Sequence, residues 1–458
     1  MEKAERRLRV PARSAVWYTG INFATKSVGI LTTPFFTRLL GVGDYGVYSL
    51  YMSVLGVLSV GLSAFFSSGA IYRCFGKFSD ERHSFLCSGF LVAGSVSLLI
   101  CPLLFAFLPY TGLDSRFSIL IVLQIFLDAV IALRCAELKY GYEYRTVAFI
   151  NLVIALMGPA LGAALIVGGG LSYLGRIFGL LLTSGTVALP LLATVSRRGR
   201  VKGSMCTEIV RKSAPLLPQT ASSATWGQLD KILIGSLAGT AALAKYSIAH
   251  SLGIALTTLT GGISAALLPW MSRKLTAGGG DTVRRVNDCL YAAFGAGALF
   301  VVGLAPEAMR LLAPAEYSDA TVAVAPIALS ALPAFATSIL SSGAALTGRS
   351  GRTAIPSLSG VLLSLLMNLL LLERLGFFGA GLSLLVSQLL ALGASVLFYK
   401  GERSMSTDAI LNPLLYAFAI SLPLALLYDH LWARLLILTV PACIAITRLL
   451  SLKELITE

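Results

Sequence analysis

The sequence predicts an all-α polytopic membrane protein with about fourteen transmembrane helices. Composition is the first observation, because 56% of the 458 residues are hydrophobic and only 13% are charged, against roughly 25% charged in soluble domains. The second is that apolar runs of about 20 residues recur from end to end, each long enough to cross a bilayer as a helix. The third is that basic residues gather in alternate connections, which orients these helices.

Hydropathy and the spacing of polar residues give the expected spans in order. They are residues 14–38, 44–72, 84–109, 117–138, 147–168, 171–195, 213–236, 243–270, 287–312, 320–346, 354–372, 377–399, 411–428 and 431–450. The first span is too long, and lacks the small-residue cleavage site, for a secretory signal peptide. The connections are short, so no soluble domain is expected in which an enzyme active site could be built.

The connections alternate in charge. Counted together with the adjoining span ends, one set, which begins with the segment before residue 14, holds 27 of the 36 Lys and Arg residues and 13 of the 22 acidic residues. The opposite set, counted in the same way, holds six basic and seven acidic residues. Short basic connections stay in the cytoplasm, and an even number of spans preserves this bias. Both termini are therefore expected in the cytoplasm.

Other function classes find little support in the sequence. The basic residues are scattered over short loops, which is typical of topology and of contact with anionic membrane lipids rather than of nucleic-acid binding. The seven cysteines show no CxxC spacing, so no metal or redox site is expected. There is no HExxH motif, no phosphate-binding glycine loop before a helix and no Ser-His-Asp set. We expect neither an enzyme nor a cofactor.

A weak internal repeat appears when the chain is compared with itself at an offset of 198 residues. The paired positions are Gly41 with Gly239, Tyr48 with Tyr246, Ser49 with Ser247, and Ser53 with Ser251. Six spans separate the two units, so both have the same orientation in the membrane. The repeat predicts an N-lobe over residues 1–200 (helices 1–6) and a C-lobe over residues 201–400 (helices 7–12). The two lobes would be related by a pseudo-twofold axis along the membrane normal. Residues 401–458 would add helices 13 and 14. Paired lobes of this kind favour a transporter that works by alternating access.

Four short stretches resemble one family of exporters. They are Phe36 to Ser49, Asp230 to Gly235, Leu267 to Arg273, and Asn368-Leu369 followed by Gly376, Gly379 and Ala380. Their order and spacing resemble the multidrug/oligosaccharidyl-lipid/polysaccharide exporter superfamily, in its Wzx-like branch, from about residue 14 to residue 400. MurJ-like flippases are the second choice, because they have fourteen helices whereas many Wzx-like members have twelve.

The resemblance implies a flippase in the bacterial cytoplasmic (inner) membrane. Its substrate would be an undecaprenyl-diphosphate-linked oligosaccharide, turned from the inner to the outer leaflet and destined for O-antigen or capsule. It implies coupling to an ion gradient, with H⁺ or Na⁺, or to the membrane potential. Polysaccharide polymerase machinery is an expected partner, besides the lipid-linked substrate and membrane lipids.

Ionisable residues inside spans are unfavourable and usually face an interior cavity. Lys26 and Asp128 lie near the middle of their expected helices, and Arg176 lies in the outer part of its helix. Asp230 and Lys231 lie near an outer end, and His250 lies about two turns into the following span. Helical spacing places further polar residues with them on the faces of three helices, among them Asn22 and Gln219.

We expect the cationic and polar members of this set to bind substrate, since ammonium and guanidinium groups donate charge-assisted bonds to phosphate oxygens. These candidates are Lys26, Asn22, Arg176, Lys231, His250 and Gln219. Asp128 and Asp230 are the candidates for ion coupling. Structural alternatives remain open: Lys26 could pair with Asp128, Lys231 could reach headgroups through its long stem, and hydroxyl stripes could only pack helices.

Three other functions compete with the flippase of oligosaccharides. A lipid II flippase fits the same fold and topology. A multidrug cation antiporter would favour buried carboxylates, whereas this chain offers three basic candidates away from the span ends (Lys26, Arg176 and Lys231) against two acidic ones (Asp128 and Asp230). A membrane enzyme, such as a polymerase or an acyl transferase, would need a large extracytoplasmic loop or a catalytic His/Arg cluster, and neither is visible.

Overall fold

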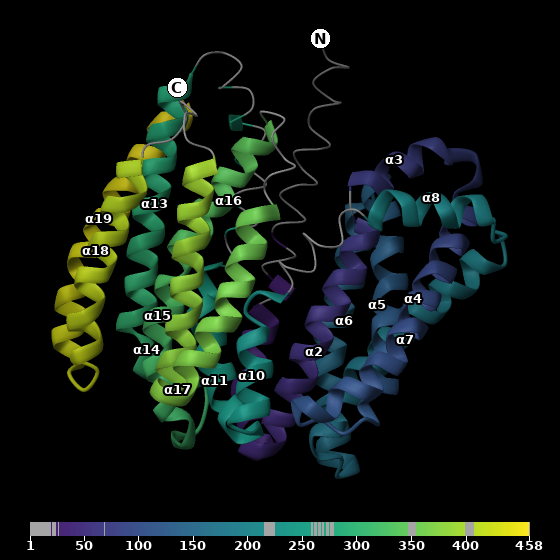
Figure 1. The fold of residues 1–458 in the computed structure, drawn as a ribbon, viewed down its shortest axis with the longest axis horizontal. Helices are drawn as coiled ribbons and strands as arrows, with labels where there is room; N and C mark the ends of the chain where they lie inside the picture. Colours follow the sequence, from purple (N-terminus) through teal and green to yellow (C-terminus); the bar gives the residue numbers. More distant parts are fainter. Residues whose placement is uncertain are drawn as a thin grey trace. The chain divides into compact units, whose positions relative to one another are not determined.

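The computed structural model is built of helices joined by short turns. It describes residues 20, 24–25, 27–67, 69–214, 225–257, 260, 263, 267, 270–271, 274, 279–346, 354–398 and 407–457. Over these residues there are sixteen α-helices, three short 3₁₀ helices and no strand. The all-α class predicted from the sequence is confirmed. The chain separates into two compact units, Met1–Ala244 and Lys245–Glu458, whose helices Figure 1 labels.

Eight helices of the described residues are long and apolar enough to cross a membrane. Four of them follow one another in unit 1: α4 (Arg82–Thr111), α5 (Phe117–Tyr140), α6 (Tyr144–Gly169) and α7 (Ser172–Ser196). Their bounds lie within three residues of the expected spans. The protein is therefore a multi-pass membrane protein.

Unit 1 is built around α5, which packs against α2 (Val42–Ser67), α4 and α7. Next to this core, α6 and α7 meet along facing small residues. A Cβ atom on Gly179 would lie 2.4 Å from the Gly162 nitrogen, and one on Gly175 would lie 2.8 Å from the Ile166 Cγ1 atom. Small residues at four-residue steps let two membrane helices approach closely, which increases their dispersion contacts.

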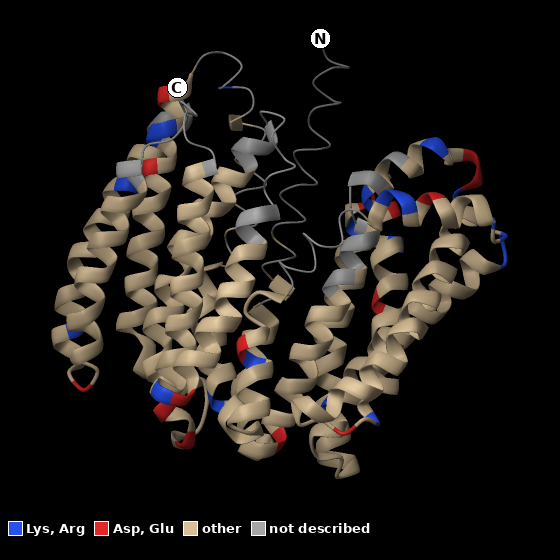
Figure 2. Cartoon of the chain, in the orientation of Figure 1, with Lys and Arg blue, Asp and Glu red and all other residues tan. Residues whose placement is uncertain are grey.

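One end of unit 1 is covered by two short amphipathic helices, α3 (Gly69–Lys77) and α8 (Gly203–Ser213). Figure 2 shows basic and acidic residues gathered around them. The Lys77 ammonium lies 2.7 Å from the Glu208 carboxylate and joins the two helices. The sequence predicted no separate helices here: residues 69–72 were expected to end the span 44–72, and the rest of α3 and nearly all of α8 were expected in cytoplasmic connections.

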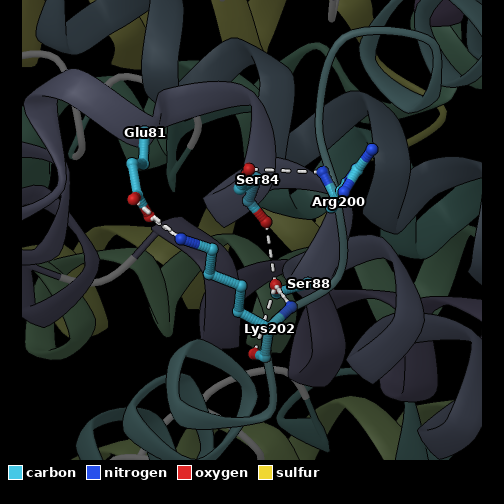
Figure 3. Close-up of polar contacts among 5 residues, drawn as sticks. All are labelled: Glu81, Ser84, Ser88, Arg200 and Lys202. Atoms are coloured by element: carbon cyan, nitrogen blue, oxygen red, sulfur yellow. Dashed lines mark hydrogen bonds and ion pairs between the residues drawn. The ribbon is translucent and has the colours of Figure 1, made fainter.

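The segment that leads into α8 is tied to the start of α4 by a polar network, drawn in Figure 3. The Lys202 ammonium lies 2.6 Å from the Glu81 carboxylate. The backbone N–H of Lys202 donates to the Ser88 hydroxyl at 3.0 Å, and that of Arg200 donates to the Ser84 hydroxyl at 3.2 Å. We call α3, α8 and these contacts the polar cap of unit 1.

Unit 2 is built around α13 (Gly280–Gly303), which packs against α15 (Val324–Leu329), α16 (Ala331–Leu346), α18 (Thr407–Leu426) and α19 (Leu431–Thr457). Two clusters of buried apolar side chains fill its interior. The span expected over 287–312 ends earlier than predicted, at Gly303. The following residues form a separate short helix, α14 (Ala305–Leu312), because its Pro306 occupies the first turn of a new helix.

An ion pair joins α19 to α14, and a hydrogen bond joins it to the end of α13. The Arg434 guanidinium donates to both carboxylate oxygens of Glu307, at 2.8 and 2.6 Å, and to the carbonyl oxygen of Gly303. The side chain of Arg434 is 2% exposed and that of Glu307 is 35% exposed. Nothing in the sequence indicated that these two residues pair.

The helical stretch α17 (Ala354–Phe398) joins two helices across Gly376, whose backbone angles are φ 55° and ψ −133°. Only glycine adopts that conformation readily. Forty-five helical residues would span about 68 Å, more than twice the thickness of a bilayer core. The break therefore falls where the sequence predicts a connection between the spans 354–372 and 377–399.

The internal repeat coincides with two helix starts. Helix α2 begins at Val42 and α11 (Thr240–Gly253) begins at Thr240, two positions that the 198-residue offset pairs. Each start follows a glycine, Gly41 or Gly239. The division of the chain at residue 200, the two-fold relation of the lobes and helices 13 and 14 as an added pair stay predictions.

Candidate functional site

A line of polar side chains crosses the apolar interior of unit 1, where α2, α5 and α7 pack against one another. Its first contact lies at the start of α2 and α7, where the Ser172 hydroxyl donates to the Asp44 carboxylate. One helical turn further along both helices, Tyr48 and Arg176 come together. Deeper still, Ser59, Asp128 and Ser184 form a cluster. We call this series of contacts the polar ladder.

Arg176 is held between aromatic rings rather than by a carboxylate. Its guanidinium carbon lies 3.7 Å from the centre of the Phe36 ring and 5.4 Å from that of the Tyr48 ring. Cation–π contacts of this kind stabilise a cation by about 0.5–2 kcal/mol, more when water is excluded. Gly162 leaves room for the stem, since a Cβ atom there would lie 3.3 Å from the Arg176 Cδ atom.

Two of the three guanidinium nitrogens of Arg176 lack a hydrogen-bond acceptor among the described residues. Its Nε and Nη1 atoms are buried, and neither has an acceptor within the part of the chain that the structure describes. Aromatic faces compensate the charge but accept hydrogen bonds poorly. A buried, unsatisfied charged donor is unfavourable by more than the 1–3 kcal/mol typical of neutral groups. The geometry of Arg176 therefore suits the binding of an anion.

Asp128 lies about 12 Å along the helix axis from Arg176, because its partner Ser184 follows Arg176 by eight residues on α7. Its carboxylate accepts hydrogen bonds from the Ser59 hydroxyl at 3.0 Å and from the Gln124 amide at 2.8 Å. The Gln124 amide also donates to the Ser184 hydroxyl at 2.8 Å, and that hydroxyl lies 3.5 Å from the carboxylate. Three helices thus converge on one carboxyl group.

The Asp128 cluster contains no positive charge within the described residues, where no basic side chain forms an ion pair with Asp128. Gln124 is 1% exposed, and its Oε1 atom has no hydrogen-bond donor among the same residues. The cluster therefore presents several oxygen atoms and one carboxyl group to a small cation or a proton.

Three other predicted site residues lie elsewhere. Asp230 is fully buried on α10 (Leu229–Leu237) in unit 1, and Lys231 beside it is half-buried. His250 is buried in unit 2, with its ring centroid 5.7 Å from that of Tyr246. Asn22, Lys26 and Gln219 lie outside the described residues, so the alternative pairing of Lys26 with Asp128 stays a prediction.

The sequence analysis missed most partners in the polar ladder. Gln124 carried a usable signal, because it precedes Asp128 by four residues and so lies on the same face of α5. Ser59 and Ser184 had no such signal, since their helices bring them to Asp128 from 69 and 56 residues away. Phe36 and Tyr48 resembled ordinary aromatic residues of an apolar segment.

The comparisons with known proteins agree with this architecture. A family model described as "Polysaccharide biosynthesis protein" matches residues 12–274, more than half of the chain. Among curated proteins, none matches.

Solved structures of transporters have the same fold. The chain is similar to the lipid II flippase MurJ in an inward closed conformation, with a TM-score of 0.69 and 13% identity over 93% of this chain and 99% of that one. A multidrug resistance MATE transporter in an outward-facing conformation gives 0.60 and 13% identity over 88% and 97%. A transporter of the MOP superfamily from Pyrococcus furiosus gives 0.60 and 14% over 86% and 96%. The chain therefore belongs to the polysaccharide biosynthesis protein family and has the fold of the membrane flippases and exporters of the MOP superfamily.

Proposed function

We propose that the protein is a flippase that moves an undecaprenyl-diphosphate-linked oligosaccharide from the inner to the outer leaflet by alternating access. The observation that carries the proposal is the half-buried side chain of Arg176, whose buried Nε and Nη1 atoms have no acceptor in the described chain. A diphosphate supplies such acceptors and the balancing charge, whereas a cationic drug would be repelled. The family match to polysaccharide biosynthesis supports the same class of substrate.

The orientation of this proposal follows the charge pattern. The polar cap carries basic residues of the connections expected in the cytoplasm, so Arg176, on the outer part of α7, would meet the diphosphate late in its passage. The termini would lie in the cytoplasm of a bacterial cell, in its cytoplasmic membrane. Lys26, Asn22, Gln219, Lys231 and His250 stay proposed members of the substrate site.

The test is flipping of a fluorescent undecaprenyl-diphosphate oligosaccharide in vesicles that contain the purified protein. Each charge-assisted hydrogen bond contributes about 1.5–3 kcal/mol, so Arg176→Gln is expected to reduce the rate by about 10- to 100-fold. Arg176→Lys keeps the charge but not the planar donors, so it should retain more activity. Arg116→Gln removes an arginine exposed at the start of α5, and it should leave flipping unchanged.

Failure of the well-folded wild-type protein to flip the oligosaccharide would overturn the proposal. Equal rates for Arg176→Gln and Arg116→Gln would refute the role of Arg176. The alternative substrate is lipid II, as in the name of the similar MurJ. It would be favoured if the same vesicles flipped lipid II faster than the oligosaccharide. Transport of a cationic dye without either lipid would favour the multidrug antiporter instead.

Asp128 is the proposed coupling site for H⁺ or Na⁺. Its carboxylate receives hydrogen bonds from three helices but no countercharge within the described chain. Binding a proton or a sodium ion would neutralise it, and this couples the arrangement of α2, α5 and α7 to the ion gradient. Asp230 stays a proposed second coupling residue.

Replacing Asp128 by Asn should make the flipping rate insensitive to an imposed pH or Na⁺ gradient, because the amide can neither release a proton nor balance a cation. Asp114→Asn is the matched control, since Asp114 is an exposed carboxylate in the connection before α5. The idea fails if the Asp128→Asn protein responds to both gradients as the wild type does.

A further inference from the structure

The turn between α5 and α6 contains a backbone irregularity. Tyr142 has φ 59°, and no other non-glycine residue of the described chain has a positive φ. The Glu143 N–H donates to the Leu138 carbonyl at 2.9 Å and the Tyr142 N–H donates to the Lys139 carbonyl at 3.1 Å. These two bonds define a Schellman motif with Tyr142 at its left-handed position, which glycine usually occupies.

The chain has a glycine next to this position but does not use it there. Gly141 directly precedes Tyr142 and has φ −78°, a conformation open to any residue. A left-handed backbone is unfavourable for a residue with a Cβ atom, and such outliers cluster at binding sites where the surroundings hold them. The unfavourable backbone conformation of Tyr142 therefore indicates that its side chain, which is 51% exposed, has a function.

Tyr142 lines a hollow of about 660 Å³ together with Tyr72, Lys139 and Tyr140. This volume is within the roughly 300–1,000 Å³ typical of small-molecule sites. Three tyrosines and one lysine thus line a single space, between α3 and the end of α5.

The floor of the hollow is rigid because an aromatic cluster supports it. The Tyr140 ring lies 5.8 Å from the Phe75 ring, which in turn contacts Phe85 at 5.3 Å between centroids. Phe75 and Phe85 are buried. Gly76 allows the approach, since a Cβ atom there would lie 3.2 Å from the Tyr140 hydroxyl. Tyr140 is therefore preorganised, which reduces the entropy lost when a ligand binds.

The chemistry of the hollow selects its ligand. Aromatic faces pack against the C–H faces of pyranose rings, phenol hydroxyls exchange hydrogen bonds with sugar hydroxyls, and an ammonium group pairs with phosphate. The ligand class is a glycosyl phosphate, which both a lipid-linked glycan and a nucleotide sugar contain.

We propose that the hollow formed by Tyr72, Lys139, Tyr140 and Tyr142 is a loading site that holds the glycan head group of the lipid-linked substrate before it enters the transporter. The inference rests on the proposed flippase function and on its topology, which places this end of unit 1 at the cytoplasmic leaflet. The first sugar stacks on Tyr142 and Tyr140, and the ammonium of Lys139 binds the adjoining phosphate.

Tyr142→Gly separates this role from a structural one. Glycine fits the left-handed position better, so the thermal midpoint should stay the same or rise. Loss of the ring should raise the half-saturating concentration of the lipid-linked oligosaccharide by about three- to tenfold, with the maximal rate unchanged. Gly141→Ala is the matched control in the same turn. Its Cβ atom would meet only ordinary contacts, and it should change neither quantity.

A second control removes the effect of interfacial tyrosines in general, which anchor membrane proteins at the headgroups. Tyr110, at the other end of α4, is 80% exposed, and Tyr110→Ala should leave the half-saturating concentration unchanged. If Tyr142→Gly also leaves it unchanged while the wild type flips its substrate, the loading site is refuted and the flippase function stands. If the wild type flips nothing, the proposed function itself has failed.

Binding experiments distinguish the two sources of a glycosyl phosphate. A short-prenyl diphosphate disaccharide should bind the purified protein, with saturation-transfer NMR signals on its first sugar that Tyr142→Gly weakens. UDP-glucose should give no such signals. Equal signals from UDP-glucose, or disaccharide signals as strong with Tyr142→Gly as with the wild type, would overturn the assignment.

Discussion

The ion pair between Glu307 and Arg434 offers the most direct test of how the C-terminal helix is held. The change is Glu307→Gln, which removes the negative charge and keeps the shape. Arg434 is 2% exposed, so its guanidinium would lose its countercharge in a nearly dry site and keep only the Gly303 carbonyl and one amide oxygen.

The size of the effect follows from the burial of the two partners. Breaking a fully buried pair is unfavourable by about 3–5 kcal/mol. Because Glu307 is 35% exposed and one amide acceptor remains, water and the amide offset part of this. We expect a loss of about 2–3 kcal/mol in the free energy of unfolding.

The assay is SDS-induced unfolding of the purified protein in detergent micelles. Glu373→Gln changes an exposed glutamate of the same unit and should stay within about 0.5 kcal/mol of the wild type. The double change Glu307→Gln with Arg434→Met removes both charges and should recover most of the loss. A Glu307→Gln protein as stable as the control would show that the pair contributes nothing.

The same pair predicts a dependence on pH. Arg434 donates to the Glu307 carboxylate and so holds the pKa of Glu307 below its ordinary value. A lowered folded-state pKa means that the stabilisation is complete above about pH 4.3, the ordinary pKa of glutamate. It is lost as the pH falls through the folded-state value. The stability difference between wild type and Glu307→Gln should therefore shrink below about pH 4.

Two further predictions concern the packing of unit 1. Gly179→Ala would place a Cβ atom 2.4 Å from the Gly162 backbone and should lower stability by about 1–3 kcal/mol. The added Cβ atom of Gly185→Ala, on the same helix, meets no atom within 4 Å, so this change should be neutral or stabilising by up to about 1 kcal/mol. If Gly179→Ala had the higher thermal midpoint of the two variants, this packing of α6 against α7 would be contradicted. Lys77→Ala breaks the ion pair with Glu208. Because the Lys77 side chain is 60% exposed, the free energy of unfolding should change by less than about 1 kcal/mol. A larger loss would mean that the attachment of α8 depends on that pair.

The sequence predicts the elements of this fold better than their contacts. The span expected over 117–138 is α5 (Phe117–Tyr140), and the break expected between residues 372 and 377 is at Gly376. Both depend on local properties, namely the length of an apolar run and the conformational freedom of glycine. Membrane spans are the strongest such signal, because every backbone polar group must be satisfied within its own helix.

The candidate site was predicted only in part, for a physical reason. Arg176 and Asp128 were recognisable because an ionisable residue in an apolar span is rare. The rings around Arg176 and the hydroxyls around Asp128 come from other helices, and nothing in their local sequence distinguishes them. The strain at Tyr142 was equally hidden, because a glycine one residue earlier made the turn look ordinary.

The polar cap of unit 1 combines two kinds of contact that respond differently to ionic strength. The side chains of Lys202 and Glu81 are each nearly half exposed, and at 1 M salt the Debye length is only about 3 Å. Their attraction therefore fades in concentrated salt. The backbone hydrogen bonds from Lys202 and Arg200 to the serine hydroxyls of α4 carry no net charge and do not fade. Helix α8 should stay attached through purification in molar salt, while the surface around it loses its electrostatic pull on anionic lipids.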